Sequence, residues 1–168
     1  MAMDVRFWGV RGSYPVPGPS TNRYGGNTAC VQVCPPDGGT IILDAGTGIR
    51  RLGHELMKGP AGQGDAEIHI LVSHTHWDHI QGLPFFSPLY EAGNKIQIYG
   101  RQREVHLEDI FRTQSAAPYF SHHLDEVAAR VSYVELIEGA SFELGKVLVT
   151  CARLNHPDIA IGYRLEAD

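Results

Sequence analysis

The residues best suited to chemistry lie in one short segment, Ser73-His74-Thr75-His76-Trp77-Asp78-His79. Residues two apart in an extended chain point the same way, so His74 and His76 can present two imidazoles to one ion. Asp78 and His79 lie beyond a bend and can face a second point close by. Neutral imidazole and carboxylate suit zinc, at roughly 2.0–2.2 Å, and also suit manganese or iron. This clustering of histidine and aspartate predicts a divalent-metal site.

The histidines outside this segment need a separate interpretation, because a lone histidine is more often a hydrogen-bonded structural residue than a ligand. His156 differs from the rest, since it follows an expected apolar strand over 147–154 and precedes Pro157, which stops regular pairing. A strand end projects a ligand well, and on the residues alone the ligand and structural interpretations of His156 are equally good. The histidines interpreted as structural or surface residues are His54, His69, His106, His122 and His123.

The elements that must position the segment follow from hydrophobic periodicity. Strands and helices alternate early and strands cluster late, which predicts a mixed α/β chain. A long loop rich in glycine and proline, Arg11 to Gly26, follows the first strand. Strands are expected over 5–10, 28–34, 40–43, 68–72, 96–99, 131–137, 141–144, 147–154 and 160–165, with helical segments over 49–57, from 78 to before Pro84, over 103–112, and for a turn or two over 124–130.

Composition limits the classes of function. The formal net charge of −5 argues against a broad electrostatic grip on nucleic acid, which needs clustered lysine and arginine. No apolar run approaches the roughly 18–20 residues that span a membrane. Cys30, Cys34 and Cys151 are odd in number and follow no secretory signal, which favours reduced thiols in a cytoplasmic protein. Cys30 and Cys34 fall in a strand pattern and are interpreted as buried apolar residues rather than ligands.

The segment His74-Thr75-His76-Trp77-Asp78-His79 resembles the H-x-H-x-D-H signature of the metallo-β-lactamase-fold hydrolases. Ile41 to Gly46 is similar to the family strand that ends in Asp-x-Gly ahead of the metal motif. Gln81 to Phe86 resembles the branch that contains ribonuclease Z and the phosphonate-pathway cyclic phosphodiesterase. Asn155-His156-Pro157 falls where the family places its third first-site histidine, so the resemblance covers the whole chain.

The resemblance implies an αββα sandwich in which two metal ions, zinc by preference, bind side by side. Carried over, His74, His76 and His156 would hold the first ion, and Asp78 and His79 would belong to the second. A metal pair can generate a hydroxide nucleophile and clamp an in-line displacement. Asp78 is the candidate catalytic residue, because it could orient that hydroxide or move its proton.

Asp44, which ends the strand that precedes the motif, has two interpretations that are equally good. It could fix the motif loop as a residue behind the metal ligands. It could instead only stabilise its own turn.

The chain departs from the family pattern near its end. The family continues with an aspartate that bridges the metals and a final histidine, and neither Asp158 nor Asp168 lies in a matching context. We therefore expect residues 1–168 to form a single, incomplete domain, with only the first half and part of the second half of the sandwich. Missing strands would leave a sheet edge and a core face uncovered, which favours self-association or a completing chain.

The expected function is metal-dependent hydrolysis of phosphodiester bonds by a metal-activated hydroxide. A small or cyclic phosphodiester is preferred over tRNA, because the chain is acidic and no basic arm is visible. Ser13, Arg23 or Asn27 of the long loop could contact phosphate, although a purely structural loop is at least as good an explanation. The alternative is a catalytically incomplete metal-binding fragment or assembly module that holds one ion and needs a partner chain.

Overall fold

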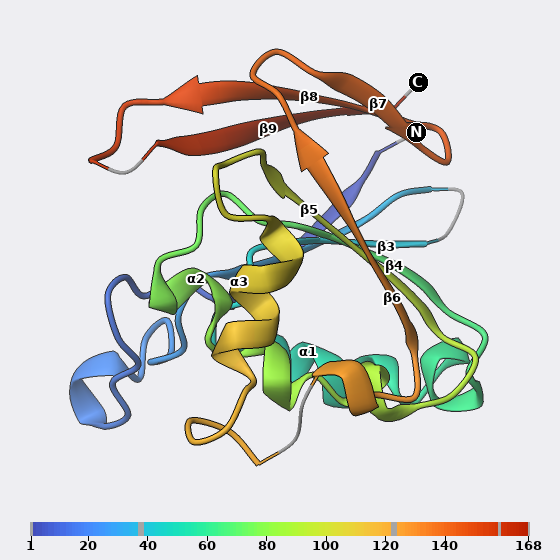
Figure 1. Cartoon of the computed structure of the whole chain (residues 1–168). Coiled ribbons are helices and arrows are strands. Elements are labelled where there is room, and N and C mark those ends of the chain that lie inside the picture. Colours follow the sequence, from blue (N-terminus) through green and yellow to red (C-terminus); the bar gives the residue numbers. More distant parts are fainter. Residues whose placement is uncertain (1, 37–38, 122–123, 158, 168) are drawn as a thin grey trace.

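The computed structural model describes residues 2–36, 39–121, 124–157 and 159–167, and these form three layers (Figure 1). A six-stranded sheet lies in the middle, helices lie on one of its faces, and a three-stranded sheet covers the other face. The first sheet has the order β1-β2-β3-β4-β5-β6, with β1 (Asp4–Gly9), β2 (Cys30–Cys34), β3 (Thr40–Leu43), β4 (Glu67–Leu71), β5 (Lys95–Arg101) and β6 (Arg130–Leu136). The second sheet contains β7 (Ser141–Leu144), β8 (Val147–Leu154) and β9 (Ala160–Ala167).

The helices are short. They are α1 (Gly48–Leu56), α2 (Trp77–Ile80) and α3 (Leu107–Gln114), and single 3-10 turns lie at Pro19–Thr21, Pro60–Gln63, Leu83–Phe85, Ser87–Tyr90 and Leu124–Glu126. β1, β2 and β3 pair in antiparallel fashion, whereas β3, β4, β5 and β6 pair in parallel. Because the carboxyl ends of parallel strands meet at one edge, the loops after β3 and β4 lie side by side there.

Two cores form on the two faces of the first sheet. Ile70 of β4 points toward the helices and belongs to the core that includes Ile49 and Leu52 of α1. Its neighbour Leu71 points the other way and packs with Val149 of the second sheet. Strands buried on both faces are rich in apolar residues at successive positions, and all residues from Ile68 to Val72 except His69 are apolar, which explains why β4 was predictable from its sequence. The αββα class is confirmed as far as the chain extends: the described residues supply one helical layer and two sheets.

Helix α3 begins later than the sequence predicts, so the expectation of a helix from Arg103 is wrong. His106 has extended backbone angles and is the N-terminal capping residue. Glu135 of β6 accepts a hydrogen bond from the Leu107 backbone N–H at 2.8 Å. A carboxylate from a distant strand therefore sets the first helical residue. The helical turns expected over 124–130 reduce to the 3-10 turn at Leu124–Glu126, because β6 begins at Arg130.

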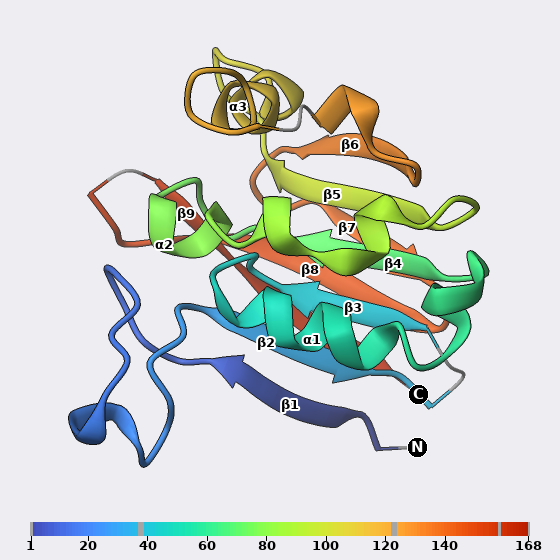
Figure 2. The ribbon, with the colours of Figure 1, turned by 90° about the horizontal axis from the view of Figure 1, so that it is seen from below.

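One edge of the first sheet is uncovered. Val5 and Phe7 of β1 lie opposite Val33 and Val31 of β2, so they share the face that turns toward the second sheet. Val5 is nevertheless 53% exposed and Phe7 69% exposed. Figure 2 shows β1 at the outer edge of the first sheet, with most of β7, β8 and β9 behind the other strands of that sheet. Val5 and Phe7 therefore leave apolar surface exposed at this edge, while the missing strands and the coverage of this surface by another chain both stay predictions.

The cysteines are confirmed as unpaired. Cys30 and Cys151 are buried, and Cys34 is half-buried. Burial raises the pKa of the Cys30 thiol, and the charge of Asp44 adds to that effect. Within the described residues no helix is both long and apolar enough to cross a membrane. The cytoplasmic location stays a prediction.

Candidate metal centre

The candidate site lies at the shared carboxyl edge of β3 and β4. Asp44 follows β3 directly, and Ser73 and His74 follow β4 after Val72. His76 has extended backbone angles and caps α2, so the chain bends there and places Asp78 and His79 within the helix. The sequence expectation of a strand, a bend and a short helix at this point is confirmed.

His156 completes a group of three histidines with His74 and His76. One imidazole nitrogen from each lies within 4.8 Å of the others. The ring centroid of His156 is 4.4 Å from that of His74 and 5.1 Å from that of His76. His156 comes from the β8–β9 connection in the second sheet, 80 residues after His76, so the fold itself brings this group together. Three converging imidazoles are a donor set that suits a divalent ion.

Asp44 holds the motif in place from the neighbouring strand. Its Oδ1 accepts a hydrogen bond from the Ser73 backbone N–H at 2.7 Å, and its Oδ2 accepts one from the Ser73 hydroxyl at 2.9 Å. Its Oδ2 also lies 2.7 Å from His79 Nδ1. These contacts favour the first interpretation of Asp44, a residue behind the ligands, over a turn that serves only itself. Asp44 adopts a φ of 62°, a left-handed conformation that aspartate and asparagine tolerate better than most residues.

Asp78 is held from the other side by the long β1–β2 loop. The Ser13 backbone N–H donates to Asp78 Oδ2 at 2.8 Å, and His79 Nε2 lies 3.4 Å from the same oxygen. Ser13 has a φ of 71°, which is unusual for a residue other than glycine. Asp78 and His79 thus form a pair beside the three histidines, and the ring of His79 lies 4.1 Å from that of His74.

The surroundings of His74 and His79 shift the pKa values of these two histidines in opposite directions. Burial, together with the neighbouring imidazoles, lowers the pKa of His74 to about 4, so this ring is neutral at physiological pH. Burial also acts to lower the pKa of His79, but the hydrogen bond and the charge of Asp44, with the charge of Asp78, raise it above the ordinary value. A neutral His74 is already in the form that binds a metal ion.

The second sheet is tied directly to the start of the motif. The Ile161 backbone N–H of β9 donates to the Ser73 carbonyl at 2.9 Å. The Tyr163 hydroxyl donates to the Val72 carbonyl at 2.8 Å, and burial raises the pKa of this phenol. These two bonds fix β9, and with it the loop that carries His156, against the motif.

All five predicted site residues therefore lie in one region, with His74, His76 and His156 as one group and Asp78 with His79 as another. Sequence reasoning missed Ser73 and Tyr163, although Ser73 adjoins the motif and is polar at the end of a buried strand. His54 and His106 are exposed, as expected of surface residues. His122, His123, Asp158 and Asp168 lie outside the described residues.

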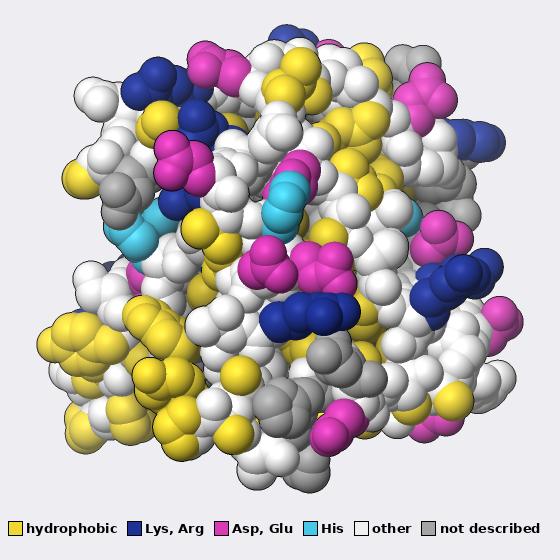
Figure 3. All heavy atoms as spheres, in the orientation of Figure 1, with side chains coloured by type: hydrophobic (Ala, Val, Ile, Leu, Met, Phe, Trp, Pro, Cys, Tyr) yellow, Lys and Arg dark blue, Asp and Glu magenta, His cyan; other side chains and the backbone are white. Residues whose placement is uncertain are grey.

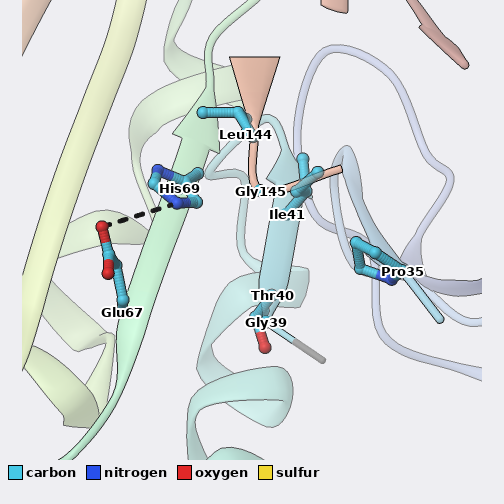
Figure 4. A pocket seen from close by; sticks show the side chains of 8 residues that line it. All are labelled: Pro35, Gly39, Thr40, Ile41, Glu67, His69, Leu144 and Gly145. Carbon is cyan, nitrogen blue, oxygen red and sulfur yellow. Dashed lines mark ion pairs between the residues drawn. The ribbon is translucent and has the colours of Figure 1, made fainter. Parts of the chain in front are cut away.

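His69 lies elsewhere, which agrees with its structural interpretation. It lines a cavity of about 250 Å³ with Glu67, Thr40 and Leu144 (Figure 4). That cavity is at the amino ends of β3 and β4, whereas the candidate metal centre is at their carboxyl ends. Burial lowers the pKa of His69, so this cavity offers a neutral imidazole remote from the other histidines.

The three-layer fold and the site define the class of protein as metallo-β-lactamase-like. Residues 40–168 match the family described as the Beta-lactamase superfamily domain. The chain belongs to this family, whose fold implies a bound divalent metal ion.

Two curated relatives illustrate the likeness. Ribonuclease Z of Prochlorococcus marinus (strain MIT 9215) is 30% identical over 128 residues, which are 74% of this chain and 38% of the relative. Ribonuclease BN of Cronobacter sakazakii is 27% identical over 170 residues, which are 98% of this chain and 49% of the relative. The chain spans about half or less of the length of these relatives.

Solved structures agree on the fold. The metallo-beta-lactamase fold protein YhfI from Bacillus subtilis has a TM-score of 0.67 at 16% identity, covering 98% of this chain and 57% of that one. Human tRNase Z, short form, has a TM-score of 0.65 at 24% identity, covering 97% of this chain and 64% of that one. These similarities support the layered architecture.

Proposed function

We propose that the chain carries the metal-binding half of a site that hydrolyses phosphodiester bonds. The observation that carries the proposal is the group formed by His74, His76 and His156, which comes from both sheets and stands beside the Asp78–His79 pair. His74, His76 and His156 would hold one ion, and Asp78 and His79 would contribute to a second. Zinc is preferred, and manganese or iron suits the same donors.

The residues present fit a divalent ion. The three imidazole nitrogens face one another at close range, and burial keeps His74 neutral. Asp44 accepts a hydrogen bond from His79 Nδ1, which leaves the Nε2 lone pair of His79 for a metal ion. Carboxylates hydrogen-bonded in this way orient metal-binding histidines. When bound, a divalent ion lowers the pKa of a coordinated water and polarises phosphoryl oxygens.

The protein side chains have distinct roles in such a hydrolysis. The Asp78 carboxylate, held by the Ser13 N–H, can accept a proton from the attacking water. The water oxygen then forms the new bond to phosphorus as the ester P–O bond breaks, and the leaving alkoxide takes up the proton that Asp78 has accepted. Asp44 and Ser73 keep the motif loop rigid while this occurs, since their hydrogen bonds join β3 to the first residue of the motif.

The preference for a small phosphodiester over tRNA remains part of the proposal. It is supported by the net charge of −5 and by acidic and basic side chains that are interspersed over the face seen in Figure 3. The names of the relatives, ribonuclease Z and ribonuclease BN, favour an RNA substrate instead. Comparing the hydrolysis of precursor tRNA with that of bis(p-nitrophenyl) phosphate decides between the two substrates.

The test is turnover of bis(p-nitrophenyl) phosphate by the chain loaded with zinc, manganese or iron. We expect metal-dependent release of p-nitrophenol that chelation abolishes, and we expect Asp78→Ala to reduce turnover more than it reduces metal content. Asp65→Ala is the matched control, because Asp65 is exposed and precedes the amino end of β4, whereas the motif follows the carboxyl end of that strand. Absence of turnover with all three metals at full occupancy would favour the alternative, a metal-binding module that needs a partner chain. The uncovered face of β1, at Val5 and Phe7, favours that alternative.

A further inference from the structure

A second cavity adjoins the candidate metal centre and is built by the β1–β2 loop. It has a volume of about 380 Å³, and its lining includes Arg11, Ser13, Ser20, Arg23 and Tyr24. A cavity of this size is large enough for a phosphate group and part of a sugar. Ser13 lies between the cavity and the candidate metal centre. It lines the cavity, and its backbone N–H donates a hydrogen bond to Asp78.

The lining of this cavity is positively charged in a chain that is negatively charged as a whole. The stretch from Val10 to Ala29 contains Arg11 and Arg23 and no aspartate or glutamate. Within the described part of the chain, neither guanidinium forms an ion pair with a carboxylate. Each instead stacks over a tyrosine ring, Arg11 at 5.5 Å from the ring centroid of Tyr14 and Arg23 at 5.0 Å from that of Tyr24. Stacking of this kind holds a guanidinium plane in place, and its terminal NH₂ groups stay available even in Arg11, whose Nε–H is donated to the Tyr14 carbonyl.

The loop is held in shape before any ligand arrives. The Thr21 hydroxyl donates to the Val16 carbonyl at 2.8 Å, and the Val16 N–H donates to the Gly26 carbonyl at 3.0 Å. A Cβ on Gly26 would lie 1.8 Å from the Val16 carbonyl oxygen, so only glycine fits there. The left-handed conformation of Ser13 belongs to the same loop, and such backbone strain concentrates at functional sites. A preformed cavity avoids the cost of ordering a loop on binding.

We propose that this cavity is a subsite for a second phosphate group of the substrate. Guanidinium groups recognise phosphate through parallel charge-assisted hydrogen bonds, and the hydroxyls of Ser13 and Ser20 can add neutral ones. The inference rests on the proposed function and narrows it. The scissile phosphodiester lies at the histidines, and the substrate carries a further phosphate at the Arg11–Arg23 side, as in a short oligonucleotide or a terminally phosphorylated dinucleotide.

The test compares three dinucleotides that differ only in a terminal phosphate: ApA, pApA and ApAp. Their dissociation constants are measured by calorimetry with the full 168-residue chain, kept metal-free with a chelator so that none is cleaved. We expect pApA or ApAp to bind about tenfold to a hundredfold more tightly than ApA, the range for one hydrogen bond to a charged group. Equal dissociation constants for the three dinucleotides would overturn the subsite.

Substitutions of the cavity arginines test whether the tighter binding of the terminally phosphorylated dinucleotides depends on this cavity. Arg23→Gln is the principal variant, because Arg11 also donates its Nε to the Tyr14 carbonyl at 3.1 Å and supports the loop. We expect Arg23→Gln, and in second place Arg11→Gln, to reduce the preference to about threefold or less, whereas the exposed control Arg50→Gln on α1 retains it. A preference that survives in both cavity variants would refute the assignment. Turnover of bis(p-nitrophenyl) phosphate by the metal-loaded chain tests the hydrolase proposal separately, since this substrate has a single phosphate.

Discussion

Replacing Asp44 with asparagine tests how the fold prepares the motif for metal. The left-handed backbone at Asp44 suits asparagine, so the substitution changes the side chain and spares the turn. The amide oxygen can still accept the Ser73 N–H, but an NH₂ group now faces His79 Nδ1, which Asp44 contacts at 2.7 Å. His79 must then accept at Nδ1 and carry its proton on Nε2, the nitrogen beside Asp78.

The expected size of the effect of Asp44→Asn follows from the hydrogen bonds that the Asp44 carboxylate makes to Ser73 and His79. Loss of such a partner behind a metal ligand typically costs about 10–100-fold in metal affinity, or roughly 1.4–2.7 kcal/mol. The free energy of unfolding of the metal-free chain should also fall by roughly 1–3 kcal/mol, because bonds to a charged acceptor become neutral ones. A competition titration against a chromogenic zinc chelator measures the affinity, and urea unfolding measures the stability. The exposed Asp65→Asn is the control. Unchanged zinc affinity in Asp44→Asn would refute this reasoning.

Two further predictions concern packing and pH. Gly46→Ala should lower the free energy of unfolding by roughly 1–3 kcal/mol, because the added Cβ would lie 2.3 Å from the Asp78 carbonyl oxygen. Urea unfolding measures this change. The control is Gly59→Ala, which should have little effect because the added Cβ would lie 3.7 Å from its nearest neighbour, the Leu56 carbonyl oxygen. Burial raises the pKa of Tyr99 to about 12. The free energy of unfolding should therefore be unaffected by Tyr99 below about pH 10, the pKa of a free phenol. Between about pH 10 and 12 it should decline, because the phenol loses its proton in the unfolded chain before it does in the folded one. Tyr99→Phe should decline less steeply over that interval, and an equal slope would contradict the prediction.

Most strands of the fold were predictable because each is an apolar run ended by glycine, proline or a polar turn. β4 and the motif that follows it are the clearest example. Periodicity alone did not divide the late strands into a separate sheet, since strand pairing is set by contacts far apart in sequence; the second sheet was predicted only through the family resemblance. The predicted start of α3 was wrong for the same reason. Glu135, 28 residues further along the chain than Leu107, accepts the hydrogen bond from the Leu107 backbone N–H at which the helix begins.

The candidate site was predictable where chemistry and spacing coincide. His74, His76, Asp78 and His79 are close in sequence, and the resemblance to the metallo-β-lactamase fold added His156. The contribution of Ser13 was beyond sequence reasoning, because it acts through a backbone N–H that a left-handed φ turns toward Asp78, 65 residues away. Side-chain identity carries no signal for such a contact.

The most direct test of the central claim is the zinc content of the purified chain and of His156→Ala, measured by mass spectrometry after exhaustive dialysis. His156 reaches the other two histidines only through the fold, so it tests sequence and structure together. The exposed His54→Ala on α1 is the matched control. We predict at least one tightly held ion in the wild type and in His54→Ala, and loss of most of it in His156→Ala. Full zinc content in His156→Ala would contradict the assignment of this histidine group as the metal site.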